Sequence, residues 1–241
     1  IEKALAIALE GRPGPVHLDL PISTAKATET VKRPAPRSKP APMAPAPGPD
    51  WDAACQALSD AERPLIIAGV DVLHHHASDC VADMARRFSI PILTTYKAKG
   101  VLPEDHHLAL GGHGLSPKAF SIIKPLIDQA DAIVLAGYDP IEMRSEWCAP
   151  WDLSEDGPTV IEFSATANRH FVHHASHSFI GDVGAGILAL TKKVSRNGSW
   201  PGGEPAKIRA ALMSAFPRKE AWGPAAVIDV CRNVLPRETV A

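Results

Sequence analysis

The 241-residue sequence has few aromatic residues, 5% of the total, and its charges nearly cancel to a formal net charge of −2. A chain this close to neutral produces no long-range field that would favour nucleic acid or an anionic membrane surface. No apolar run approaches the roughly 20 residues that a transmembrane helix requires. We therefore expect neither a nucleic-acid partner nor a membrane partner.

Cysteine is also scarce, and the four residues, Cys55, Cys80, Cys148 and Cys231, are widely spaced without a C-x-x-C pair. This spacing is unsuited to a structural zinc site and is typical of reduced thiols in a cytoplasmic protein. The chain starts at Ile1 rather than Met and has no charged leader. We expect it to be a piece of a longer protein.

From residue 50 onward, short apolar runs alternate with helical patterns. Buried strands are predicted at 64–69, 90–95, 132–137, 159–163 and 178–181. Amphipathic helices are predicted at 51–61, 77–88, 117–129 and 183–193. Strands that are apolar throughout indicate a parallel sheet covered on both faces. The predicted fold is a three-layer α/β structure with a Rossmann-like, doubly wound parallel sheet.

The sequence predicts four parts along the chain. Residues 1–24 contain a helix, a turn and a strand at 16–20, and are too few to fold alone. Residues 25–49 are rich in proline and alanine, which favours an extended linker without a core. Residues 50–195 form the middle α/β domain, and 196–241 begin with a glycine-rich linker and continue into helices.

Several stretches, taken in order, resemble one family. They are Gly11–Pro21 (GRPGPVHLDLP), Arg63–Gly69 (RPLIIAG), Leu110–Gly114 (LGGHG, interpreted as a glycine turn) and Gly137–Glu142 (GYDPIE). Together they are similar to thiamine-diphosphate enzymes of the acetolactate synthase superfamily, and GYDPIE is similar to the catabolic, flavin-independent members. The order and spacing of the stretches carry the resemblance, which covers nearly the whole chain.

The resemblance implies a parent enzyme that uses thiamine diphosphate and Mg²⁺ to decarboxylate a 2-keto acid such as pyruvate and condense the product. Residues 1–24 would end its pyrimidine-binding domain, and 196–241 would begin its diphosphate-binding domain. The family's metal-holding Gly-Asp-Gly motif is absent from these residues. We expect the fragment to be structural, without catalytic residues or bound thiamine diphosphate, and the parent to be a cytoplasmic homo-oligomer. Another 2-keto acid decarboxylase is an alternative.

A nucleotide-binding module is a second alternative, because middle domains of some family members bind FAD or ADP. Glycines that follow strands let backbone approach a phosphate. The G-x-G-x-x-G fingerprint is absent, and Val70, Asp71 and Asp139 depart from the flavin-binding pattern, so bound FAD is not expected. A simpler interpretation is that the glycines only end strands. The candidate residues are Gly69, Thr95, Gly112, His113 and Gly137.

By the same resemblance, Tyr96 and Lys97 follow the second strand at positions that shape substrate access. Lys97 would attract the carboxylate of a keto acid; the alternative is a solvated lysine on a surface loop. A charged group after the third strand is interpreted as a turn rather than an acid/base pair. Its members are Asp139, Glu142, Arg144 and Glu146.

The histidines gather in two places, a run at 74–76 and a second group spaced to share one helical face. The second group comprises His170, His173, His174 and His177. Such a face suits Zn²⁺ or Ni²⁺, but no nearby carboxylate or cysteine completes a ligand set. Both groups are interpreted as polar surface, and no metal site is predicted.

Overall fold

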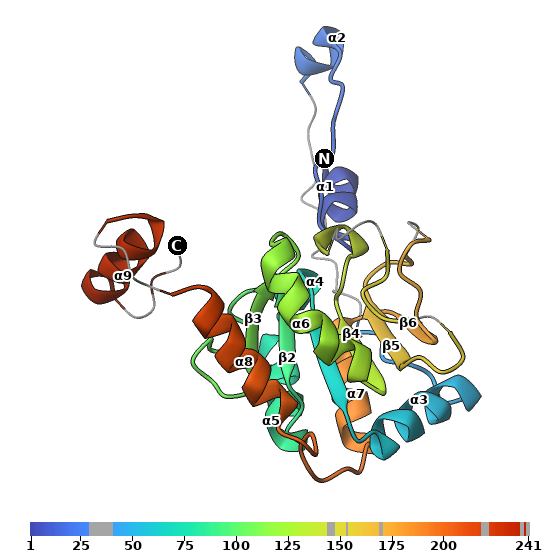
Figure 1. The fold of residues 1–241 in the computed structure, drawn as a ribbon. Coiled ribbons are helices and arrows are strands. Elements are labelled where there is room, and N and C mark those ends of the chain that lie inside the picture. The colour runs from blue at the N-terminus through green and yellow to red at the C-terminus, as the bar shows by residue number, and fades with distance from the viewer. Residues whose placement is uncertain are drawn as a thin grey trace.

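The computed structural model describes residues 1–28, 41–143, 148–152, 154–168, 171–217, 222–236 and 239. Within them the body is a six-stranded sheet of order β3-β2-β1-β4-β5-β6, in which every neighbouring pair is parallel. The strands are β1 (Pro64–Ala68), β2 (Ile92–Thr95), β3 (Ala109–His113), β4 (Ala132–Ala136), β5 (Thr159–Ser164) and β6 (His177–Ile180). The predicted α/β fold is confirmed (Figure 1).

Helices cover both faces of the sheet and complete three layers. One face packs against α3 (Pro49–Asp60), α5 (Ser78–Phe88) and α7 (Val183–Lys193). The other packs against α6 (Pro117–Gln129) and α8 (Glu204–Ala215). In β1, Ile66 and Ala68 join the first core while Leu65 and Ile67 join the second. Because both faces are buried, the strand is apolar throughout rather than alternating.

Local polar caps explain why the two best-predicted helices begin where they do. The Ser116 side chain accepts a hydrogen bond from the Ala119 N–H at 3.2 Å, which caps α6. Asp182 caps α7 in the same way through the Ala185 N–H, at 2.8 Å. Each cap satisfies one of the backbone donors that a helix N-terminus leaves without a partner. The observed bounds of both helices match the predicted ones.

Two predicted elements differ from the structure. Leu110–Gly114, predicted as a turn, lies mostly in the edge strand β3, where His113 pairs with Thr95. Its glycines weaken the strand signal, so the pattern resembled a turn. Val16–Leu20, predicted as a strand, belongs to no strand of the described residues, and its three apolar side chains are exposed. A strand needs a partner for its backbone donors and acceptors.

The segment after α7 runs along the amino-terminal edge of the sheet. The buried guanidinium of Arg196 donates to the Phe88 carbonyl at 2.6 Å and to the Ala61 carbonyl at 3.2 Å, at the ends of α5 and α3. The Trp200 indole N–H donates to the Pro64 carbonyl at 2.8 Å, where β1 begins. These contacts hold the connection to α8, so that α8 lies on the second face of the sheet.

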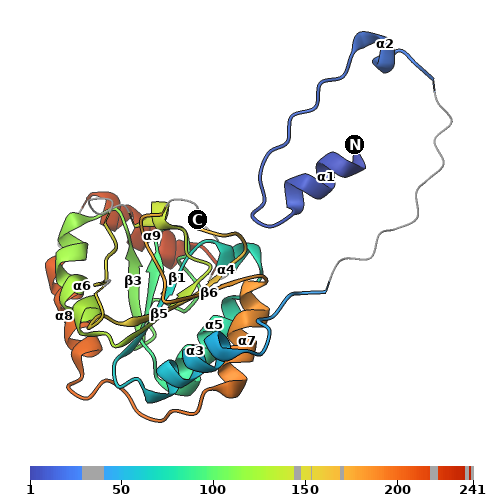
Figure 2. The same cartoon turned by 90° about the vertical axis from the view of Figure 1, so that its right-hand side faces the viewer.

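The remaining helices contribute little to the core. They are α1 (Glu2–Leu9), α2 (Ile22–Ala25), the short α4 (Asp71–His74), the 3₁₀ helix η1 (Pro140–Glu142) and α9 (Pro224–Val234). α1, α2 and α9 bury no residue, and α1 and α2 stand away from the body (Figure 2). Across the described residues, no helix has the length and apolarity that a membrane crossing requires.

The strand order creates a crevice at a defined place. From β1 the chain proceeds outward to β2 and β3, and then returns through α6 to β4 on the other side of β1. Open parallel sheets bind ligands outside the carboxyl ends of their strands at such a switch point. The residues that follow β1 and β4 are therefore the expected place for a binding site.

Candidate functional site

The residues predicted for a nucleotide site all lie at the carboxyl edge of the sheet. Gly69 and Gly137 directly follow β1 and β4, Thr95 and His113 end β2 and β3, and Gly112 lies within β3. The topology thus places all five along one edge, as expected for residues that follow parallel strands. Their contacts show how each position is used.

The two glycines at the switch point bring the ends of β1 and β4 into direct contact. A Cβ atom on Gly69 would lie 2.4 Å from the Gly137 carbonyl oxygen and 2.5 Å from the Tyr138 Cα. Gly137 has a φ of +57°, which favours glycine, and its carbonyl accepts the Asp71 N–H at 3.1 Å. Both positions lack a side chain because the two turns pack directly against each other.

Glu142 reaches into the crevice from η1, although its sequence position indicated only a turn. Glu142 is fully buried. The carboxylate accepts the Val70 N–H at 3.2 Å and the hydroxyl of Thr95. Burial raises the pKa of Glu142 above its ordinary value of 4.5, and these hydrogen bonds oppose the shift. A carboxylate of the chain itself therefore occupies the backbone donor after β1, which faces phosphate in dinucleotide folds.

A second ionic group lies beside Glu142 and involves Arg12. Nε of Arg12 lies 3.1 Å from both carboxylate oxygens of Asp71, and Nη2 lies 2.8 Å from Oδ2. Nη1 of the same guanidinium donates to Asp139. Asp71 is fully buried and also contacts Nδ1 of His74 at 3.0 Å. The hydrogen bonds to Asp71 raise the pKa of Arg12 and keep the guanidinium charged.

Sequence reasoning did not identify Arg12, which it placed in a turn. The available signal was indirect: Asp71 and Asp139 each follow an apolar strand, so parallel strands bring them to one edge where a cation is needed. That argument predicts a basic partner without choosing it among the 25 lysines and arginines of the chain. Arg144 and Glu146, which were grouped with Asp139 and Glu142, lie outside the described residues.

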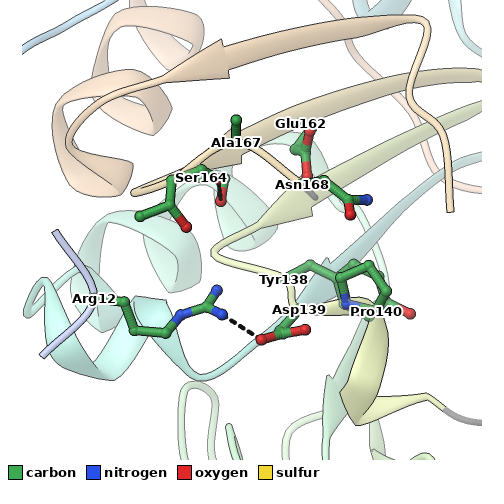
Figure 3. A pocket seen from close by; sticks show the side chains of 9 residues that line it. Arg12, Tyr138, Asp139, Pro140, Glu162, Ser164, Ala167 and Asn168 are labelled. Atoms are coloured by element: carbon green, nitrogen blue, oxygen red, sulfur yellow. Dashed lines mark hydrogen bonds and ion pairs between the residues drawn. The ribbon is translucent and has the colours of Figure 1, made fainter. Parts of the chain in front are cut away.

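Beside this ionic group lies an open cleft of about 350 Å³ (Figure 3). It lies past the ends of β4 and β5. Glu162 is buried, and its Oε2 accepts the Ser178 hydroxyl at 2.6 Å. Burial raises the pKa of Glu162 above 4.5, against the effect of that hydrogen bond. The lining residues are Arg12, Tyr138, Asp139, Pro140, Glu162, Ser164, Thr166, Ala167 and Asn168.

His113 and Gly112 lie away from that cleft, on the side of β3. The imidazole of His113 is buried, Nε2 lies 2.9 Å from the Leu110 carbonyl oxygen, and Nδ1 has no partner among the described residues. Burial lowers the pKa of His113 and favours the neutral ring. A Cβ on Gly112 would lie 2.8 Å from the Lys99 side chain. Neither residue lines the cleft next to Arg12.

The predicted access residues follow β2 at the same edge. The Tyr96 N–H donates to the His113 carbonyl at 2.8 Å, and its side chain is partly buried. Lys97 is exposed, with its ammonium 5.8 Å from the centre of the Tyr96 ring. Lys97 is therefore free to meet a solute at the carboxyl edge.

The second histidine group does not form a helical face. It was interpreted as polar surface, which agrees with the exposed His174 but not with the buried His173. His177 begins β6 and His174 is exposed in the preceding loop, while His170 lies outside the described residues. His173 is buried, with Nδ1 2.9 Å from the Tyr138 hydroxyl and its ring stacked on Tyr138. The i, i+3, i+4, i+7 spacing alone therefore does not establish a helix.

The run at 74–76 lies at the surface, with His74 and His76 exposed, and two of its rings contact carboxylates. His74 contacts Asp71, and Nδ1 of His75 lies 3.3 Å from Asp182 Oδ2. His76 has a φ of +52° in the turn that follows α4. Within the described ranges, no three His, Cys, Asp or Glu side chains are placed to hold a metal ion.

The charges of the crevice determine which ligand chemistry it suits. Asp71 and Asp139 bind the guanidinium of Arg12, and the carboxylate of Glu142 lies close enough to act on it electrostatically. A diphosphate placed there would face these carboxylates, and the nearest backbone donor already binds Glu142. The residues therefore do not fit the diphosphate of FAD or ADP.

Comparison with known proteins assigns the middle part of the chain. A family model described as "Thiamine pyrophosphate enzyme, central domain" matches residues 51–190. The probable acetolactate synthase large subunit of Methanocaldococcus jannaschii is 37% identical over 123 residues, covering 46% of this chain and 20% of that protein. The 2-hydroxyacyl-CoA lyase 1 of Mus musculus is 32% identical over 139 residues, covering 57% of this chain and 22% of that protein. The chain thus spans about a fifth of these relatives.

A solved structure extends the likeness beyond the matched residues. Benzoylformate decarboxylase from Polynucleobacter necessarius superposes with a TM-score of 0.71 and 21% identity. The superposition covers 99% of this chain and 43% of that chain. At this level of identity it shows a shared fold.

The buried carboxylate in the cleft generates a prediction about pH. The pKa of Glu162 is raised in the folded chain, so above pH 4.5 the unfolded chain releases a proton that the folded chain still holds. The free energy of unfolding therefore falls as pH rises from 4.5 through the folded pKa. Relative to the unmodified chain, Glu162→Gln should raise the free energy of unfolding by about 1 kcal/mol more at pH 8 than at pH 4.

Urea unfolding from pH 4 to pH 8 measures this difference. The matched control is Glu155→Gln, on an exposed loop residue, whose difference from the unmodified chain should stay flat. A Glu162→Gln curve parallel to that of the unmodified chain would show that Glu162 does not carry the effect.

Proposed function

Because the chain belongs to the thiamine-pyrophosphate enzymes through their central domain, we propose that it is the middle part of an enzyme that decarboxylates a 2-keto acid and condenses the product, in the manner of an acetolactate synthase. The family match over residues 51–190 is the observation that carries the proposal. The relative from Methanocaldococcus jannaschii supports the acetolactate type. The proposed substrate is pyruvate or a similar 2-keto acid.

The parts of the chain have different proposed roles. Residues 1–24 end the pyrimidine-binding domain, 25–49 link it to the middle domain at 50–195, and 196–241 lead into the diphosphate-binding domain. The parent is proposed to be a cytoplasmic homo-oligomer. The low cysteine content, four residues spread over the chain without a C-x-x-C pair, is compatible with a reducing compartment.

The middle domain is proposed to be a scaffold without flavin. The GYDPIE segment supports this, because its side chains take up the crevice. Tyr138 packs on His173, Asp139 binds Arg12, and Glu142 binds Val70 and Thr95. The Glu142 contact uses the Val70 N–H, the backbone donor after β1 that a diphosphate would meet in a dinucleotide fold.

Thiamine diphosphate supplies an electron sink for the carbanion left when CO₂ departs. Within the described part of the chain, no three His, Cys, Asp or Glu side chains lie together to hold its Mg²⁺, so these residues are not proposed to bind the cofactor. No reaction step is therefore assigned to these residues. Their proposed contribution is to hold the neighbouring domains and, through Tyr96 and Lys97, to line the approach of the substrate.

A nucleotide-binding module is the second candidate, and the 350 Å³ cleft favours it. The cleft lies at the carboxyl edge of the sheet, where nucleosides bind in open α/β folds, and Glu162 could accept hydrogen bonds from ribose hydroxyls. The three carboxylates beside Arg12 count against a diphosphate-bearing ligand.

The parent protein with thiamine diphosphate, Mg²⁺ and pyruvate tests both candidates in one preparation. We expect release of CO₂ with formation of acetolactate, and no visible absorbance of a flavin in the purified protein. A yellow protein that leaves pyruvate unchanged would reject the proposal in favour of the nucleotide module.

Lys97 generates a second prediction in the same assay. Its exposed ammonium should attract the carboxylate of the keto acid, so Lys97→Ala should raise KM for pyruvate about 3-fold and leave kcat unchanged. The matched control is Lys99→Ala, because the Lys99 ammonium is paired with Glu104 at 3.3 Å. Equal KM values for the two variants would assign Lys97 to solvated surface.

A further inference from the structure

The N-terminal segment touches the body at one turn. α1 and α2 bury no residue and lie apart from the sheet (Figure 2). At the turn between α1 and the extended residues that follow, a Cβ on Gly11 would lie 3.3 Å from the Thr166 methyl group. The next residue, Arg12, extends into the crevice. Two consecutive residues therefore meet two different loops of the middle domain.

The guanidinium of Arg12 joins the two sides of the switch point. Nε and Nη2 bind Asp71, which follows β1. Nη1 binds Asp139, which follows β4, as Figure 3 shows. Its planar fork makes these contacts in fixed directions, whereas the ammonium of a lysine is a point charge on a flexible stem. The geometry of Arg12 is therefore set by both strand ends together.

The backbone on both sides of Arg12 is conformationally restricted, so the direction of its side chain is coupled to the path of the chain. Gly11 has a φ of +60°, Pro13 has a ring-restricted φ, and the Gly14 N–H donates to the Ala8 carbonyl at 3.0 Å. The turn is thus constrained on both sides of Arg12. Its orientation determines where residues 16–20 leave the body.

We infer that Arg12 is a positioning residue of the proposed reaction, which orients residues 1–24 on the middle domain through Asp71 and Asp139. This inference rests on the proposed function, in which residues 1–24 belong to a domain that binds the cofactor. Arg12 touches neither cofactor nor substrate in this role. It acts by fixing the angle at which the domain that ends with residues 1–24 sits on the middle-domain scaffold, and so the placement of that domain's own groups, which must be aligned within a fraction of an ångström.

A simpler role for Arg12 is to neutralise the buried Asp71, and a mutant cycle separates the two roles. In the 241-residue chain, Arg12→Ala leaves the Asp71 carboxylate without its cation and should lower Tm by about 5 °C. Asp71→Asn in the Arg12→Ala background removes the stranded charge and should recover most of that loss. The matched control is the exposed pair Arg86 and Asp83, 3.2 Å apart, whose cycle should show almost no coupling.

The same variants in the parent enzyme test positioning. With pyruvate, thiamine diphosphate and Mg²⁺, Arg12→Ala should lower kcat about 10-fold with KM unchanged, because alignment is lost and substrate binding is not. The Arg12→Ala/Asp71→Asn variant should remain low in kcat although its Tm has recovered. Arg12→Lys should restore Tm more than kcat, because it keeps the charge and loses the fork.

The outcomes distinguish the inference from the proposed function. A double variant with full kcat would reduce Arg12 to a counter-charge and overturn positioning. A cycle without coupling in Tm would overturn the contact itself. A parent without activity on 2-keto acids would reject the proposed function and the catalytic part of this inference, while the Tm cycle would still decide whether Arg12 binds Asp71.

Discussion

Three carboxylates meet where β1 and β4 end, and each needs a partner because moving an ionised carboxylate out of water costs several kcal/mol. Asp71 and Asp139 share the guanidinium of Arg12, while Glu142 binds the Val70 N–H and the Thr95 hydroxyl. Removing one of these partners leaves a carboxylate with less compensation for its lost hydration. The geometry of the switch point therefore depends on this set of contacts, which joins four separate stretches of the chain.

This arrangement explains how a sheet of the dinucleotide-binding type can serve as a scaffold. The glycines after β1 and β4 pack against each other's backbone, and the donor that would face a phosphate is taken by Glu142. The crevice thus keeps the topology of a ligand site while its own side chains fill the centre. The open cleft that Glu162 borders lies beside this filled centre.

The layers and helix bounds were predictable because they depend on local patterns. Continuous apolar runs indicated buried strands, and Ser116 and Asp182 mark helix starts that lie within a few residues of their partners. β3 was missed because two glycines interrupt its apolar character. Val16–Leu20 was assigned a strand from its own residues, but pairing depends on a neighbour that a local pattern does not contain.

The candidate site was less predictable because its contacts span the chain. The five positions at the carboxyl edge followed from their places after strands, but their use did not. Arg12 lies 127 residues from Asp139 in sequence, and Glu142 was interpreted as a turn because a carboxylate after Pro140 carries no sign of burial. Contacts between such distant residues depend on strand order, which residue patterns leave open.

Calorimetric titration of ADP and FAD into the 241-residue chain tests most directly whether the crevice is filled by its own carboxylates. The account predicts no saturable binding of either ligand up to about 1 mM. Saturable binding in the micromolar range, weakened by Asp139→Ala or by Arg12→Ala, would contradict it and place a nucleotide at the switch point.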